Sequence, residues 1–279
     1  MNIVITGAGG VLCSAFSRAL AADGHKIALL DLNLEAAERE AEGIRKAGGE
    51  AIAVQANVLD KESLKKAHDV VLEEFGPCEV LINGAGGNNP KGTTTSEYFS
   101  KEDMLDENAR SLFDLDQDGV SFVFNLNFLG TLLTTQAFAT DMLETGGCIV
   151  NISSMNAFTP LTKIPAYSGA KAAVSNFTQW LAVHFANCNI RVNAIAPGFF
   201  ATNQNRTLLF NEDGSLTPRS HKIISQTPMG RFGKPEELLG TLRFLIDNDA
   251  SGFVTGITIP VDGGFRSEEH TSELQSRVE

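Results

Sequence analysis

The feature that most constrains this fold is a regular alternation of short apolar segments with longer amphipathic ones. Each apolar run has the length of a buried strand, and most are followed by a segment with helical spacing. The runs lie at residues 2–5, 26–31, 51–58, 79–87, 148–152, 190–196 and 257–261. Because parallel strands need crossover connections, this order predicts an α/β fold: one doubly wound parallel sheet in a three-layer α/β/α arrangement, with ligands at the carboxyl ends of its strands.

Composition limits the classes of partner. The chain has 279 residues, of which 43% are hydrophobic, so it is long enough for one large domain with a full core. Its formal charge of −12 argues against nucleic acid and against an anionic membrane surface, since both select basic proteins. No apolar run approaches the length of a membrane span.

The four cysteines show no spacing typical of zinc or redox sites. Cys13, Cys78, Cys148 and Cys188 are far apart in the sequence. We expect them to be reduced, in a cytoplasmic protein without a metal site. The amino terminus leads directly into an apolar strand, so we expect no signal peptide.

The first strand runs into a glycine-rich turn typical of dinucleotide binding. Thr6-Gly7-Ala8-Gly9-Gly10 precedes a helix that starts near Val11, where free N–H groups can bind a pyrophosphate. The second strand ends at Asp31, whose carboxylate can accept hydrogen bonds from ribose hydroxyls and repel a 2′-phosphate. The pattern favours NAD over NADP. The alternatives are a turn without a ligand, and an Asp31 that caps the helix beginning near Leu34.

Three residues further along suggest acid–base chemistry. Ser154 follows the strand at 148–152, and Tyr167 and Lys171 are four apart on a helix, so they share one face. We expect the ammonium to lower the pKa of the phenol, and Ser154 to donate a hydrogen bond to the same substrate oxygen. The alternative is a surface tyrosine and lysine without a catalytic role.

Together these motifs resemble the short-chain dehydrogenase/reductase family over nearly the whole chain to Phe265. The resemblance implies a Rossmann-type fold and a catalytic set of Asn127, Ser154, Tyr167 and Lys171, with Asn125 as the alternative if the register differs. Asn127 would hold a water that links the lysine to solvent. The chain departs from the family pattern at three positions: Val11 and Cys13 replace glycines, and Gly84 replaces an asparagine.

The resemblance also implies a set of cofactor residues. They are Gly7, Gly9, Gly10, Val11, Leu12, Asp31, Asn57, Val58, Asn83, Gly84, Ala85, Tyr167, Lys171, Pro197, Gly198 and Thr202. The family further implies a homodimer or homotetramer.

Two long polar segments, 88–119 and 203–234, are expected to be binding loops or lids. Their amides and cations suit a polar, hydroxyl-rich substrate. The predicted substrate residues are Asn88, Asn156, Lys163 and Arg206, with Asn89, Lys91, Gln204 and Asn205 also on the rim. Several stretches resemble family members that interconvert D-fructuronate and D-mannonate, and Arg206 or Lys163 would then pair with the carboxylate.

Other functions stay open at this point. The runner-up is a polyol or other sugar dehydrogenase. A non-catalytic NAD-binding regulator and a dehydratase or epimerase on the same scaffold are further alternatives. We expect one domain at residues 1–265. Residues 266–279 lack apolar periodicity and resemble translated adaptor sequence, so we expect them to be a non-native or disordered tail outside the fold.

Overall fold

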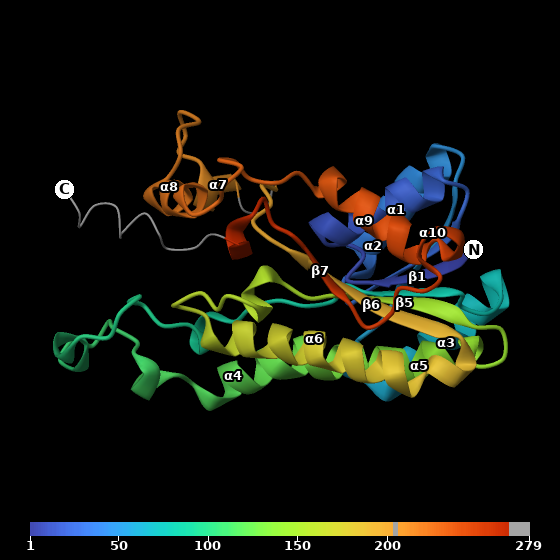
Figure 1. Ribbon diagram of the computed structural model, residues 1–279, viewed down its shortest axis with the longest axis horizontal. Coiled ribbons are helices and arrows are strands. Elements are labelled where there is room, and N and C mark those ends of the chain that lie inside the picture. Colours follow the sequence, from blue (N-terminus) through green and yellow to red (C-terminus); the bar gives the residue numbers. More distant parts are fainter. Residues whose placement is uncertain (203–205, 268–279) are drawn as a thin grey trace.

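The computed structural model describes residues 1–202 and 206–267, and a single parallel sheet forms its centre (Figure 1). The seven strands are β1 (Asn2–Thr6), β2 (Lys26–Asp31), β3 (Glu50–Gln55), β4 (Val80–Asn83), β5 (Gly147–Ile152), β6 (Ile190–Pro197) and β7 (Thr258–Val261). Their order is β3-β2-β1-β4-β5-β6-β7, and every pairing is parallel. The predicted doubly wound sheet is confirmed.

The strand order reverses between β1 and β4. The chain builds outward from β1 through β2 to β3, then returns to place β4 on the other side of β1, in the register Ile3↔Val80 and Ile5↔Ile82. A reversal of this kind opens a crevice at the carboxyl ends of the two central strands, because their connections leave in opposite directions. The glycine-rich segments after β1 and β4 both lie at this crevice.

Helices cover both faces of the sheet (Figure 1). One face carries α1 (Val11–Ala22), α2 (Leu34–Lys46), α9 (Leu239–Ile246) and α10 (Asn248–Ser251). The other carries α3 (Lys61–Phe75), α4 (Gln117–Phe124), α5 (Gly130–Phe138) and α6 (Pro165–His184). The helix starts follow local chemistry, since Asn33 caps α2 and Asp60 caps α3 through side-chain oxygens that accept backbone N–H groups.

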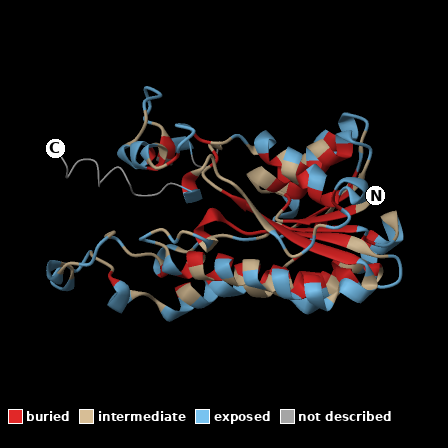
Figure 2. Cartoon of the chain, viewed as in Figure 1, coloured by how far each residue is buried: buried red, intermediate tan, exposed pale blue. Residues whose placement is uncertain are grey.

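Side chains alternate along each strand between two hydrophobic clusters, which appear as the red centre of Figure 2. Ile3 and Ile5 pack towards Phe16 of α1, whereas Val4 packs in the cluster that contains Phe138 of α5. Burying an aliphatic side chain of this size contributes roughly 1.5–3 kcal/mol. A shift of one residue in register would exchange the two clusters, so the sheet register is strongly specified.

The two segments expected to be loops have more structure than the sequence predicts. Residues 88–116 form an arm that extends away from the sheet, and α7 (Arg206–Leu209) and α8 (Pro218–Ser225) stand above it on the opposite side of the crevice (Figure 1). Glu97 of the arm forms an ion pair with Lys222 of α8. Shorter 3₁₀ turns lie at Pro90–Gly92, Lys101–Met104, Leu112–Asp114, Ala139–Met142, Met155–Ala157, Ala186–Cys188, Pro235–Leu238 and Phe265–Ser267.

The described chain continues slightly past the proposed domain boundary at residue 265. The backbone N–H of Arg266 donates to Asp262 Oδ2 at 2.9 Å, and its guanidinium lies 4.2 Å from the ring centroid of Phe158. The rest of the proposed tail, 268–279, lies outside the described residues, so the boundary stays a prediction. Among the helices that the structure describes, none is long and apolar enough to cross a membrane.

Candidate active site

The turns after β1 and β4 are in direct contact. Thr6 Oγ1 accepts hydrogen bonds from the N–H groups of Gly84 at 3.1 Å and Ala85 at 3.2 Å. Gly7 has a φ of +66°, and a Cβ there would lie 2.9 Å from the Ala85 Cα. A side chain at position 7 would therefore be strained and would also push the two turns apart.

A cavity of about 430 Å³ runs along these turns. Ten of the predicted cofactor residues line it: Gly7, Gly10, Val11, Leu12, Asp31, Asn57, Val58, Gly84, Ala85 and Thr202. The sequence prediction missed Cys13, Leu32, Ala56, Gly86 and Leu126, which also line it. The cavity reaches from the end of β2 to the segment after β6, and its floor is glycine backbone at a helix amino terminus. These properties fit an extended dinucleotide.

Asp31 is held at the β2 end of this cavity. Its Oδ2 accepts the Gly9 N–H at 2.9 Å, and its Oδ1 accepts the Asn33 N–H at 2.9 Å. The helix cap is Asn33, whose Oδ1 accepts from Ala36 N, so the alternative that Asp31 caps α2 is wrong. Asp31 instead fixes the glycine turn and presents its carboxylate to the cavity.

Not all the predicted cofactor residues reach this cavity. Asn83 is buried, and its side-chain amide donates to Thr135 Oγ1 at 3.1 Å and Asn151 Oδ1 at 2.9 Å, so it supports the sheet from within. Pro197 is the last residue of β6. Gly198 lines a second, smaller cavity.

Two hydrogen bonds attach α6 to the end of β5. Lys171 Nζ donates to Ile152 O at 2.8 Å, and Ser153 Oγ donates to Lys171 O at 3.1 Å. Pro165 starts the helix, and Tyr167 and Lys171 follow on one face. This attachment brings both side chains to Ser154, which begins the 3₁₀ turn Met155–Ala157. The structure thus brings together the three residues that the sequence singled out.

The expected effect of Lys171 on Tyr167 is wrong for this structure. Burial is the main influence on Tyr167 and raises the pKa of its phenol, while a hydrogen bond with Ser154 acts to lower that pKa. The ammonium lies 5.7 Å from the phenol ring centroid. Burial also lowers the pKa of Lys171 to about 8, so its side chain loses the charge as pH rises above that value.

Asn127 lies on the same side of the crevice as Lys171. It is fully buried within a π-helical turn, Asn125–Leu129, between α4 and α5, and such turns often occur at functional sites. Its amide donates to Gly87 O at 2.7 Å. A Cβ on Gly86 would lie 2.6 Å from Asn127 Oδ1 and 3.1 Å from Lys171 Nζ, so Gly86 leaves open a space that both residues border. Asn125, the alternative, is exposed.

The predicted substrate residues are spread around the crevice. Asn156 is buried beside Ser154, and its Oδ1 has no hydrogen-bond partner among the described residues. Asn88 is exposed at the start of the arm, where it donates to Thr93 Oγ1. Lys163 is exposed, and the Arg206 guanidinium lies 5.6 Å from the ring centroid of Phe210. Gln204 and Asn205 lie outside the described residues.

A second cavity of about 230 Å³ adjoins the first on the α7–α8 side. Its lining residues are Leu12, Gly198, Phe199, Phe200, Thr202, Leu209, Arg219 and Ile223. Leu12 and Thr202 line both cavities, so the two spaces meet there. Arg219 was not among the predicted site residues, because nothing in its local sequence distinguishes it from other surface cations.

Comparison with known proteins shows the family of this chain. Residues 9–266 match the family model described as enoyl-(acyl carrier protein) reductase. An uncharacterised oxidoreductase of Haemophilus influenzae is 60% identical over 264 residues, which cover 94% of this chain and 92% of that protein. The chain belongs to the short-chain dehydrogenase/reductase family. It is therefore an NAD(P)-dependent oxidoreductase by family, as the sequence predicted.

Two further relatives cover a similar share of the chain. The uncharacterised oxidoreductase UxuB of Bacillus subtilis is 53% identical and covers 94% of this chain and 93% of its own length. A crystal structure of a protein from Haemophilus influenzae, proposed to be a D-mannonate oxidoreductase, contains bound NAD. It is 58% identical, with a TM-score of 0.92, and covers 96% of this chain and 95% of that one.

The structure explains two departures from the short-chain dehydrogenase pattern together. A Cβ built on Gly84 would lie 2.2 Å from Cys13 Sγ, far closer than two such atoms can approach. The thiol at position 13, where the family has glycine, therefore occupies the space next to position 84, where the family has asparagine. Cys13 and Gly84 are complementary replacements in two turns that touch.

Proposed function

We propose that this protein is an NAD-dependent oxidoreductase that interconverts a sugar-acid ketone and its alcohol, with D-fructuronate and D-mannonate as the pair. The observation that carries the reaction class is the attachment of α6 to β5, which brings Ser154, Tyr167 and Lys171 together, with Lys171 Nζ next to Gly86 in the lining of the cavity suited to a dinucleotide. The Haemophilus influenzae relative, with its bound NAD and proposed mannonate activity, supports the choice of cofactor and substrate.

Each catalytic side chain has a distinct role in this proposal. In reduction, the Tyr167 hydroxyl donates its proton to the substrate oxygen, and Ser154 donates a hydrogen bond to the same oxygen. Bound nicotinamide supplies the hydride in reduction and accepts it in oxidation. Lys171 would hold the ribose of a bound nicotinamide cofactor and restores the proton on Tyr167. Asn127 positions a water for that relay, in the space that Gly86 leaves open.

Asp31 gives the cofactor preference. It lines the cavity with its carboxylate fixed by two backbone N–H groups, in a position to accept ribose hydroxyls. A 2′-phosphate would place further negative charge against it. Asn156 contributes an unpartnered buried oxygen beside Ser154, which suits a substrate with several hydroxyl groups. Asn88 and the cations Lys163 and Arg206 are further candidate contacts on the rim.

The test is to measure NADH oxidation with D-fructuronate and, in parallel, with D-fructose, which has the same ketone but no carboxylate. We expect a much higher kcat/KM for the acid. If D-fructose or a polyol is turned over well and D-fructuronate is not, the runner-up, a polyol or sugar dehydrogenase, replaces this proposal. A failure of all substrates to consume NADH, with NAD still bound, would favour a non-catalytic regulator.

We also propose a homodimer or homotetramer in the cytoplasm. The outer side of α6 exposes Trp180 and Val183, and Trp180 stacks on Phe177 with ring centroids 5.9 Å apart. An apolar surface of this kind suits a subunit contact. The four free cysteines suit a reducing compartment. Light scattering on the purified protein measures the assembly directly.

A further inference from the structure

The second cavity has an unusual lining. Seven of its eight lining residues are uncharged, and five of these have apolar side chains: Leu12 of α1, and Phe199, Phe200, Leu209 and Ile223 on the segment after β6 and on α7 and α8. Arg219 of α8 is the one charged residue in that described lining. Arg219 is exposed, so an anion can reach its guanidinium from solvent, and the apolar residues beside it shield one side of that contact from water.

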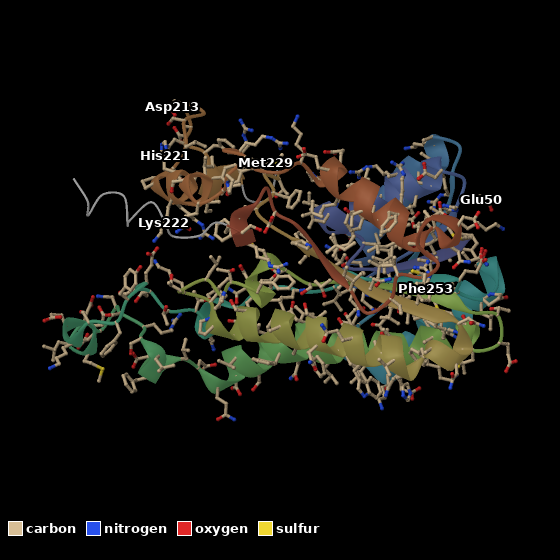
Figure 3. The ribbon with its side chains drawn as sticks, viewed as in Figure 1. Glu50, Asp213, His221, Lys222, Met229 and Phe253 are labelled. Carbon is tan, nitrogen blue, oxygen red and sulfur yellow. The ribbon has the colours of Figure 1, made fainter. Side chains whose placement is uncertain are left out.

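Arg219 has no counter-ion of its own. Within residues 1–202 and 206–267 it forms no ion pair and no hydrogen bond through its side chain. Lys222, one turn further along α8, is paired with Glu97 of the arm, on the side of α8 that faces the arm (Figure 3). On α8, Lys222 is therefore neutralised by Glu97, whereas Arg219 borders the cavity without an ion-pair partner among the described residues.

The position along the sheet indicates which end of the crevice Arg219 serves. Asp31 is the last residue of β2, whereas Gly198 and Thr202 follow β6, and β1, β4 and β5 lie between these two strands. β6 is the neighbour of β5, whose end leads to Ser154. The cavity that Arg219 lines therefore lies on the β6 side of the crevice, next to the strand whose end leads to Ser154.

We propose that Arg219 is a specificity-determining residue that binds the carboxylate of the sugar-acid substrate, an inference that rests on the proposed function. A planar guanidinium can form two parallel hydrogen bonds with a carboxylate, which fixes the orientation of the acid as well as binding it. The cations expected from the sequence are placed less favourably. All three cations are exposed, but Arg206 lies over Phe210, and neither Arg206 nor Lys163 lines either cavity, whereas Arg219 borders the smaller one.

The experiment compares single variants of the full chain. Arg219→Gln removes the charge, Arg219→Lys keeps it without the paired geometry, and Lys222→Gln is the matched control on the same helix. We measure KM for D-fructuronate, the affinity of the NADH-loaded protein for D-mannonate by calorimetry, and the affinity of the free protein for NADH by fluorescence. Arg219→Gln should weaken both measures of acid binding about tenfold or more, with Arg219→Lys in between and Lys222→Gln within about twofold of the parent.

The readouts separate the two sources of an anion at this site. If Arg219→Gln weakens NADH binding as much as D-mannonate binding, the anion is a phosphate of the dinucleotide and the proposal is wrong. It is equally wrong if D-mannonate binds Arg219→Gln as tightly as the parent, or if Arg206→Gln alone weakens that binding. If the parent protein neither binds D-mannonate nor reduces D-fructuronate, the proposed function itself is wrong. This outcome is seen with the parent alone, so it is distinct from any effect of the Arg219 variants.

Discussion

Tyr167 lies in surroundings that oppose its ionisation. Burial raises the pKa of the phenol, and the hydrogen bond with Ser154 offsets only part of that rise. A phenol that keeps its proton is suited to act as the acid when a ketone is reduced, since it must deliver that proton to the developing alkoxide. Tyr167 in these surroundings is therefore suited to the reduction of a ketone. Oxidation of the alcohol at neutral pH requires a further group that favours the ionised phenol.

Removing this hydroxyl tests the role directly. We predict that Tyr167→Phe lowers kcat by about 10²–10⁴-fold, the usual range for loss of a positioned acid, and leaves the affinity for NADH within about twofold. Stopped-flow reduction and fluorescence titration measure the two quantities. The matched control is Tyr98→Phe, since Tyr98 is the only other tyrosine and is 80% exposed on the arm. Turnover by Tyr167→Phe within a few-fold of the parent would remove this residue from the mechanism.

Asp31 has two functions that one substitution can separate. Its carboxylate accepts two backbone N–H groups and also borders the dinucleotide cavity. We predict that the parent prefers NADH over NADPH in kcat/KM by about tenfold or more, and that Asp31→Ser reduces this ratio mainly by improving the use of NADPH, because the repelling charge is gone. Asp69→Asn, an exposed carboxylate on α3, is the control. A parent that prefers NADPH would overturn the assignment.

At the scale of elements, the spacing between the β1–α1 turn and the β4 exit depends on Cys13 and Gly84. A methyl group at position 84 would meet both Cys13 Sγ at 2.2 Å and Thr6 O at 2.8 Å, and only the first of these contacts can be relieved by a change at position 13. The thiol is buried, and burial raises its pKa to about 12, so it acts here as a small apolar side chain. A side chain at position 84 is therefore strained whatever stands at position 13, and the strain is greatest when the Cys13 thiol is present.

A double-mutant cycle measures this dependence. We predict that Gly84→Ala lowers the free energy of unfolding by about 1–3 kcal/mol through overpacking, and that Cys13→Gly restores part of this loss in the double variant. The coupling energy should be about 0.5 kcal/mol or more in favour of the pair, measured by urea denaturation. NADH affinity should follow the same order, since both turns line the cavity. Strict additivity of the two changes would show that the residues do not depend on each other.

Elements with a strong local period could be predicted from the sequence, and those set by tertiary contacts could not. The seven strands follow from apolar runs such as Ile190–Pro197, which is buried throughout. By contrast, α8 is a short helix whose start is marked only by Thr217 and Pro218, and it is also stabilised by contacts from elsewhere, including Ser220 Oγ, which donates to Leu209 O. Asn83 illustrates the limit at one residue: its place next to a glycine turn suggests a ligand, but its side chain turns to Asn151 across the β4–β5 pair.

The same limit applies to Arg219 and Asn127. Nothing in the sequence around Arg219 indicates a cavity, because that cavity is made by residues from α1, the segment after β6, α7 and α8. The choice between Asn127 and Asn125 needs the rotation of the π-helical turn, which places one side chain inside and the other in solvent. Motif spacing identifies the reacting residues, whereas the recognition of substrate depends on how distant elements pack.

For the whole molecule, the main electrostatic cost of this site is the buried ammonium of Lys171. Its pKa falls from 10.5 to about 8, chiefly because burial disfavours the charged form. Below pH 8 the lysine is protonated in both folded and unfolded chains, so the cost is fully present. Between pH 8 and 10.5 the folded chain loses the proton while the unfolded chain keeps it, so this group makes stability rise with pH.

Comparing Lys171→Met with the parent isolates this group. We predict that the variant gains stability relative to the parent by an amount that is greatest at pH 7, and that the gain falls by as much as about 3 kcal/mol as pH rises towards 10. The loss of the hydrogen bond to Ile152 O lowers the gain, and it does so most where the donor is the charged ammonium. The buried thiols of Cys78 and Cys148 titrate in both proteins, so their contributions cancel in the difference. Cys13 does not cancel fully, because Lys171 acts to lower the pKa of its thiol in the parent. Denaturation by urea at pH 7, 8, 9 and 10 gives the curve, and a difference that stays constant with pH would mean that Lys171 titrates alike in the folded and unfolded chains.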